Sequence, residues 1–182
     1  MTQTEPASSP ENALIDRLMS HDICYFDGGS REPGQLAAPL VPLLRDLAQT
    51  SNSRLRSALI ALLLRHPEQA PTAETVARGL PPGDPTARLL LLSTLVAAAL
   101  QSEWSFSLDL YLPHKTRIEA DHLAVEFGLP LPREDYGRAC MEEAARLLRK
   151  DGVFPVNHEA DWENAVHRLL AQLVREARAR GS

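Results

Sequence analysis

The sequence has few aromatic residues and little cysteine. The low aromatic content is unusual for a β-sandwich, and the low cysteine content is unusual for a disulfide-stabilised domain. Phe, Trp and Tyr make up 5% of the 182 residues, whereas apolar residues as a whole make up 44%. Sandwich cores favour aromatic and β-branched side chains, while leucine and alanine are strong helix formers. The composition therefore predicts an all-α fold. A chain of this length can bury a full hydrophobic core without a disulfide or structural metal.

The two cysteines and the missing targeting signals favour a cytoplasmic protein. Cys24 and Cys140 lie far apart and in no metal-ligand spacing, so we expect two reduced thiols. The N-terminus lacks the positive region and apolar run of a signal peptide. The longest apolar run, residues 89–100, is shorter than the about 20 residues needed to span a membrane. We expect no membrane contact.

Lysine is nearly absent. Only Lys115 and Lys150 are lysines among 19 basic residues, and the guanidinium of arginine suits forked contacts with carboxylates or phosphates. The net charge of -5 opposes general binding to nucleic acid or anionic membranes. Acidic residues gather in the first 35 positions: Glu5, Glu11, Asp16, Asp22, Asp27 and Glu32. We interpret residues 1–35 as a short helix with an irregular acidic arm and residues 36–182 as a helical domain.

Apolar residues at helical spacing predict a single domain of seven or eight helices. The expected helices cover residues 10–20, 39–50, 52–66, 72–79, 84–100, 117–127, 133–150 and 160–180. In the helix over 133–150 we expect Tyr136 and Cys140 to face inward.

Two segments break the helical pattern. Residues 23–26 are β-like and predict an irregular arm with at most one short strand. Residues 104–112 alternate with a period of two, which is typical of a strand, yet the sequence offers no obvious second strand to pair with. Strand and helix both remain open for that segment.

An internal similarity appears at an offset of 32 residues. Asn52-Ser53-x-x-Arg56 aligns with Asp84-Pro85-x-x-Arg88, and an apolar helix follows each motif. A capping residue, an arginine in the first turn and an apolar helix, repeated at such an interval, resemble HEAT-type helical repeats. The resemblance covers two units, about 60 residues, and implies a section of stacked helix pairs in the middle of the chain.

The candidate motifs for chemistry are incomplete. Glu119, His122 and Glu126 share one helix face, but a carboxylate-bridged metal site needs a matching set on a second helix, and none exists. We expect His122 to be hydrogen-bonded at the edge of the core. The glycines of residues 27–30 predict a turn, and no nucleophile elbow or phosphate loop is present. The sequence therefore predicts no catalytic residue, no cofactor and no metal.

Arginines recur along the repeat-like region, and two interpretations remain open. A ridge that includes Arg54, Arg56 and Arg88 would suit a phosphate-binding face and a nucleic-acid-binding protein. Alternatively, these side chains pair with nearby acids or carbonyls. The second interpretation is favoured because no aromatic residues alternate with the arginines.

The aromatic residues of the two irregular segments are candidate partner-binding residues. They are Tyr25, Phe26, Trp104, Phe106 and Tyr111. Aromatic side chains often anchor protein interfaces, but they also close the ends of a core, so both roles remain open.

A second resemblance covers about two thirds of the chain. Residues 55–68, residues 108–112 and the Phe127-Gly128-Leu129-Pro130-x-Pro132 segment resemble a family of uncharacterised bacterial helical proteins thought to be encoded beside nucleotidyltransferases. The resemblance implies an antitoxin-like or accessory partner of a nucleotidyltransferase and provides no active-site residue. The sequence thus predicts a non-catalytic protein-interaction module, with nucleic-acid binding through the arginine ridge as the alternative.

Overall fold

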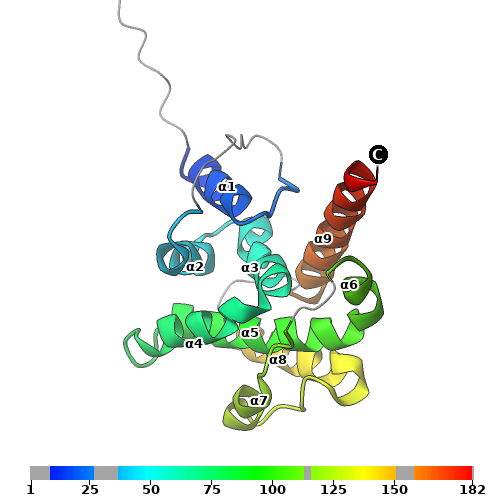
Figure 1. Cartoon of the computed structure of the whole chain (residues 1–182). Coiled ribbons are helices and arrows are strands. Elements are labelled where there is room, and N and C mark those ends of the chain that lie inside the picture. The colour runs from blue at the N-terminus through cyan, green and yellow to red at the C-terminus, as the bar shows by residue number, and fades with distance from the viewer. Residues whose placement is uncertain (1–8, 27–36, 113–115, 151–157, 182) are drawn as a thin grey trace, which may run out of the picture.

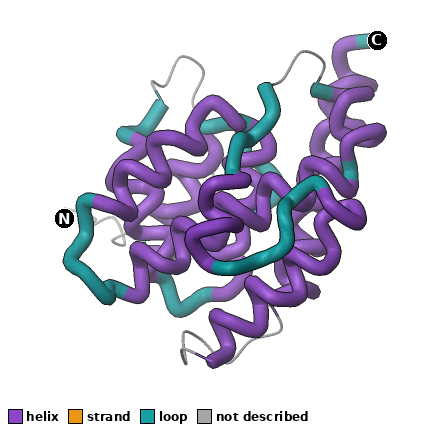
Figure 2. The backbone as a smooth tube through the Cα atoms, turned by 90° about the horizontal axis from the view of Figure 1, so that it is seen from below, coloured by secondary structure: helices purple, strands orange, loops and turns teal. Residues whose placement is uncertain are grey.

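The computed structural model describes residues 9–26, 37–112, 116–150 and 158–181. Over these residues it contains nine α-helices, two short 3₁₀-helices and no strand (Figures 1 and 2). The all-α prediction is confirmed. The helices of the N-terminal half are α1 (Pro10–Ser20), α2 (Leu40–Gln49), α3 (Ser53–Arg65), η1 (Pro67–Gln69) and α4 (Ala70–Arg78). The others are α5 (Pro85–Glu103), α6 (Ser105–Tyr111), α7 (Asp121–Phe127), η2 (Glu134–Gly137), α8 (Arg138–Lys150) and α9 (His158–Arg180).

α5 is the central helix of the fold. It is apolar on nearly all sides and packs against α3, α4, α7 and α8 (Figure 1). Among its few polar side chains, Thr94 is satisfied within the helix, since its hydroxyl donates to the Leu90 carbonyl at 2.9 Å. By length and composition α5 is apolar enough to cross a membrane, but 72% of its apolar window is buried inside the protein. That burial is compatible with the core helix of a soluble protein.

The two segments related by the 32-residue offset form neighbouring helix pairs. α3 and α5 begin at Ser53 and Pro85 and pack against each other, and their preceding helices α2 and α4 are also in contact. Both apolar helices have side-chain caps: the Asn52 Oδ1 accepts from the Arg54 and Leu55 amides, and the Asp84 Oδ1 accepts from the Thr86 amide. The sequence similarity therefore coincides with equivalent caps and packing. Membership of the HEAT class stays a prediction.

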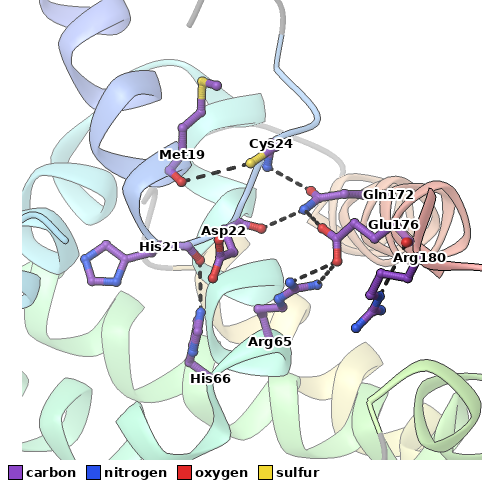
Figure 3. A network of polar contacts seen from close by, with 9 residues as sticks. All are labelled: Met19, His21, Asp22, Cys24, Arg65, His66, Gln172, Glu176 and Arg180. Atoms are coloured by element: carbon purple, nitrogen blue, oxygen red, sulfur yellow. Dashed lines mark hydrogen bonds and ion pairs between the residues drawn. The ribbon is translucent and has the colours of Figure 1, made fainter. Parts of the chain in front are cut away.

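The arm that follows α1 is attached to α9 by a buried glutamine (Figure 3). The Gln172 Oε1 accepts from the Cys24 amide at 2.8 Å, and its Nε2 donates to the Asp22 carbonyl at 2.7 Å. Residues 23–26 form no strand, and within them the Cys24 amide bonds to this side chain. The predicted boundary at residue 35 and the acids Glu5, Asp27 and Glu32 lie outside the described residues, as does the turn predicted over 27–30.

The segment over 104–112 is helical and accounts for one helix beyond the predicted number. The helix expected over 117–127 is shorter than predicted and begins at Asp121. The Gln101 side chain explains the difference, since its Nε2 donates to the Thr116 carbonyl at 3.0 Å and its Oε1 accepts from the Ile118 amide at 2.8 Å. These bonds hold residues 116–118 against α5 in a non-helical conformation.

The helix expected over 133–150 is interrupted at its start. Asp135, Tyr136 and Gly137 all have positive φ values, of 47°, 53° and 79°, so α8 begins only at Arg138. The prediction that Tyr136 faces inward is wrong, since it is 70% exposed, whereas Cys140 is buried as expected. Gly137 lies directly against Ala99 of α5, where no side chain would fit.

Candidate functional site

α6 exposes two large apolar side chains on one face. Phe106 is 86% exposed and Leu110 is 64% exposed, and their spacing of four residues places them side by side. Asp109, which is also exposed, lies on the same side of the helix. The three residues Phe106, Asp109 and Leu110 are called the α6 face below. Single exposed apolar residues are ordinary, but an adjacent pair that includes an aromatic ring is a candidate contact surface.

The opposite side of α6 is held firmly in the fold. Leu108 and Leu112 are buried, and α6 packs against α5 and α9. The half-buried Trp104, which precedes α6, meets the ring of His167 edge-on, with 5.0 Å between centroids. Its indole Nε1 is buried and has no hydrogen-bond partner among the described residues. The α6 face is therefore presented by a packed helix.

A polar cavity of about 310 Å³ lies beside α6. Its walls come from α5, α6, the segment before α7 and the segment before η2, and its charged lining residues are Asp109, Arg117, Glu119, Asp121 and Arg133. Arg133 binds Asp121 at 2.7 Å across the cavity wall. Asp109 belongs both to this cavity and to the α6 face, so the two features form one continuous surface.

A second cavity, of about 240 Å³, shares Arg117 and Glu119 with the first. It lies between α4, α5 and α7, and its lining includes Glu74 and His122. His122 is hydrogen-bonded as predicted, to Glu74 at 2.8 Å, but it lies exposed at the surface and not at the edge of the core. Among the described residues no group of three His, Cys, Asp or Glu side chains is arranged to hold a metal ion.

The carboxylate of Glu74 is the centre of an ionic network between α4 and α7. Besides His122, it binds Arg78 at 2.9 Å, and Arg78 binds Glu126 at 2.6 Å. Burial opposes the ionised form of Glu74, but the hydrogen bonds from Arg78 and His122 outweigh it and hold its pKa below the usual range. This network joins the two helices, which gives His122 and Glu126 a structural role.

The aromatic residues of the arm close one end of the core. Phe26 is buried, and the ring of the half-buried Tyr25 packs on it at a tilt, with 4.6 Å between ring centroids. Burial raises the pKa of Tyr25 well above its ordinary value, against the opposing charges of Arg168 and Arg54. The guanidinium of Arg54 lies 5.1 Å from the Phe26 ring centre. Of the five predicted partner-binding aromatics, only Phe106 is fully exposed.

The arginines do not form one exposed ridge. Arg56 is buried, and its Nη1 donates to the Thr50 carbonyl at 2.8 Å. Arg65 donates twice to Glu176 of α9, with both distances 3.0 Å. Arg88 lies over the ring of Phe127 at 5.7 Å. Contacts within the protein thus engage the predicted phosphate-binding residues Arg56 and Arg88, which supports the structural interpretation. Arg54, at the start of α3, is exposed but also contacts the Phe26 ring.

Sequence reasoning missed Asp109 and Leu110 as members of the site. A period of two placed Phe106, Leu108 and Leu110 on one face of a strand, whereas the helix separates Leu108 from the other two. A helical interpretation of the same segment would have placed Phe106 and Leu110 together.

No protein-family model, curated protein or solved structure gives a significant match to this chain.

Proposed function

We propose that this protein is a non-catalytic protein-interaction module that binds its partner through the α6 face. The observation that carries the proposal is the exposure of Phe106 and Leu110 on a helix whose other side is packed into the fold. Aromatic and large aliphatic side chains that become buried at the centre of an interface supply most of its binding energy. Exposing them to water in the unbound protein has a free-energy cost that a partner would remove.

Affinity capture from the native host tests this proposal. The full chain carrying Phe106→Ala and Leu110→Ala is compared with wild type and with Val125→Ala, which alters an apolar residue that is 75% exposed on α7. Proteins recovered on each bait are identified by mass spectrometry. A partner that binds wild type and the Val125 variant but not the double variant supports the proposal. A partner that binds all three equally contradicts it.

The family resemblance supports a more specific partner, a nucleotidyltransferase of the same bacterial cytoplasm. In this form of the proposal the chain is an antitoxin-like or accessory subunit of that enzyme. Co-expression of the chain with a nucleotidyltransferase encoded beside it should give a complex that survives size-exclusion chromatography. The double variant of α6 should elute separately from the enzyme. Separate elution of the wild-type chain would reject the enzyme as partner.

A further inference from the structure

We infer that the occupant of the α6 face is a cationic amphipathic helix of a partner protein, which sets apolar side chains on Phe106 and Leu110 and inserts a Lys or Arg into the cavity beside Asp109. This inference rests on the proposed function and specifies its partner chemistry. It combines the exposed apolar pair with the charge of the neighbouring cavity.

The apolar pair sets the geometry of the contact. Phe106 and Leu110 are one helical turn apart, which corresponds to about 6 Å along the helix axis. Apolar residues three or four apart on a second helix have the same spacing, so two such helices can interdigitate their side chains. Helical partner segments that bind hydrophobic surfaces commonly use anchors at these intervals.

The cavity beside this pair selects a positive charge. Its described charged lining consists of three acids and two arginines, and Arg133 is already bound to Asp121 at 2.7 Å. Among the described lining residues this leaves Asp109 and Glu119 beside Arg117, and neither acid forms an ion pair there. The described lining that remains thus carries an excess of one negative charge. Lysine and arginine have long apolar stems, so such a side chain can pass Leu110 and still place its charge near Asp109.

A second copy of this chain fits the α6 face less well. In a two-fold contact each residue near the axis meets its own equivalent, so the Asp109 side chains of the two copies would approach each other. Juxtaposed like charges oppose association. A partner helix that is positive near its apolar face avoids this repulsion.

Two synthetic helical peptides test the inference with the full chain. Both carry the same leucine and alanine face; one has lysines flanking that face and the other has glutamates. Binding is measured by fluorescence anisotropy of a labelled peptide at low and high salt. We expect the lysine peptide to bind at least about tenfold more tightly than the glutamate peptide and to weaken as salt increases.

Variants of the α6 face separate the apolar component of binding from the electrostatic one. Phe106→Ala with Leu110→Ala should weaken binding of the lysine peptide about tenfold or more. Asp109→Asn should weaken that binding several-fold and reduce its dependence on salt. Val125→Ala should bind as wild type. All these side chains are exposed, so the variants should keep the wild-type circular dichroism spectrum.

Several results would overturn the inference. They are equal affinity of the two peptides, no binding of the lysine peptide, an Asp109→Asn variant that binds as wild type, or a Phe106-dependent dimer in sedimentation experiments. If the native partner requires Phe106 and Leu110 but is indifferent to Asp109→Asn and to salt, the proposed function stands and the cationic helix is rejected. If the native partner ignores Phe106 and Leu110, the proposed function itself fails.

Discussion

Gln172 is a buried polar residue that links parts of the chain about 150 positions apart. Its amide joins the backbone of Asp22 and Cys24 to Glu176, and Glu176 is in turn bound by Arg65 of α3 (Figure 3). A buried amide group that makes all these bonds is tolerated because each polar atom has a partner. The arm is therefore attached to α9 by specific bonds as well as by apolar packing.

Replacement of Gln172 by leucine should strongly destabilise the protein. The Cys24 amide and the Asp22 carbonyl would each lose a partner, so we expect the free energy of unfolding to fall by about 2–4 kcal/mol. Urea unfolding followed by circular dichroism measures the change. Gln49→Leu, at the exposed end of α2, should change stability by less than about 0.5 kcal/mol. Similar effects of the two substitutions would show that the hydrogen bonds of Gln172 contribute little.

Alanine substitutions at two glycines with positive φ distinguish the cost of backbone strain from the cost of steric overlap. Gly128, with φ of 66°, has open space where a Cβ would lie, whereas a Cβ on Gly137 would be 2.7 Å from both the Cβ and the carbonyl oxygen of Ala99. Gly128→Ala should cost about 1–2 kcal/mol through backbone conformation alone. Gly137→Ala should cost at least about 3 kcal/mol, since η2 must also move away from α5. Equal costs in urea unfolding would mean that the close approach is easily relaxed.

Glu74 should make stability depend on pH in the acid range. Because its folded-state pKa is lowered, its carboxylate stabilises the protein fully above the ordinary pKa of a glutamate, about 4.3, and this contribution is lost as the pH falls through the folded value. We expect Glu74→Gln to be less stable than wild type at pH 7 and the difference to shrink as the pH is lowered to 3. Urea unfolding at several pH values measures it. A difference that does not change with pH would exclude an ionic contribution from Glu74.

At the scale of elements, the capping residues define where α3 and α5 begin. Asn52→Ala and Asp84→Ala each remove an acceptor for the first amides of a core helix and should each lower stability by about 1 kcal/mol. Asp84→Asn keeps an acceptor and should stay within a few tenths of a kcal/mol of wild type. Thermal unfolding compares the variants. Loss of stability in Asp84→Asn as large as in Asp84→Ala would assign the effect to charge.

At the scale of the whole molecule, one hydrophobic core extends from α1 to α9. Leu18 of α1, Leu59 of α3, Leu95 of α5 and Leu169 of α9 all belong to it. Since no helix has a core of its own, we expect the described helices to unfold together in a single transition. Circular dichroism and the fluorescence of Trp104 and Trp162 should give the same urea midpoint. An early loss of helical signal without a fluorescence change would mean that part of the fold unfolds separately.

The amino-acid sequence by itself determined the helical class and the starts of the best-capped helices. Leucine and alanine content, the caps Asn52 and Asp84, and the all-round apolar character of α5 are local properties, so they can be recognised without a partner surface. They predicted an all-α protein, and the structure confirms that class.

Only the tertiary structure decided which side chains the core leaves in water. Trp104, Phe106 and Tyr111 look alike in the sequence, but Trp104 and Tyr111 pack against the core, whereas Phe106 is exposed. In the same way Tyr136 is exposed, against its prediction, and the burial of Arg56 decides between the two interpretations that the sequence left open for it. Exposure depends on neighbours that are distant in the chain, and helical periodicity carries no information about which neighbour covers a given face.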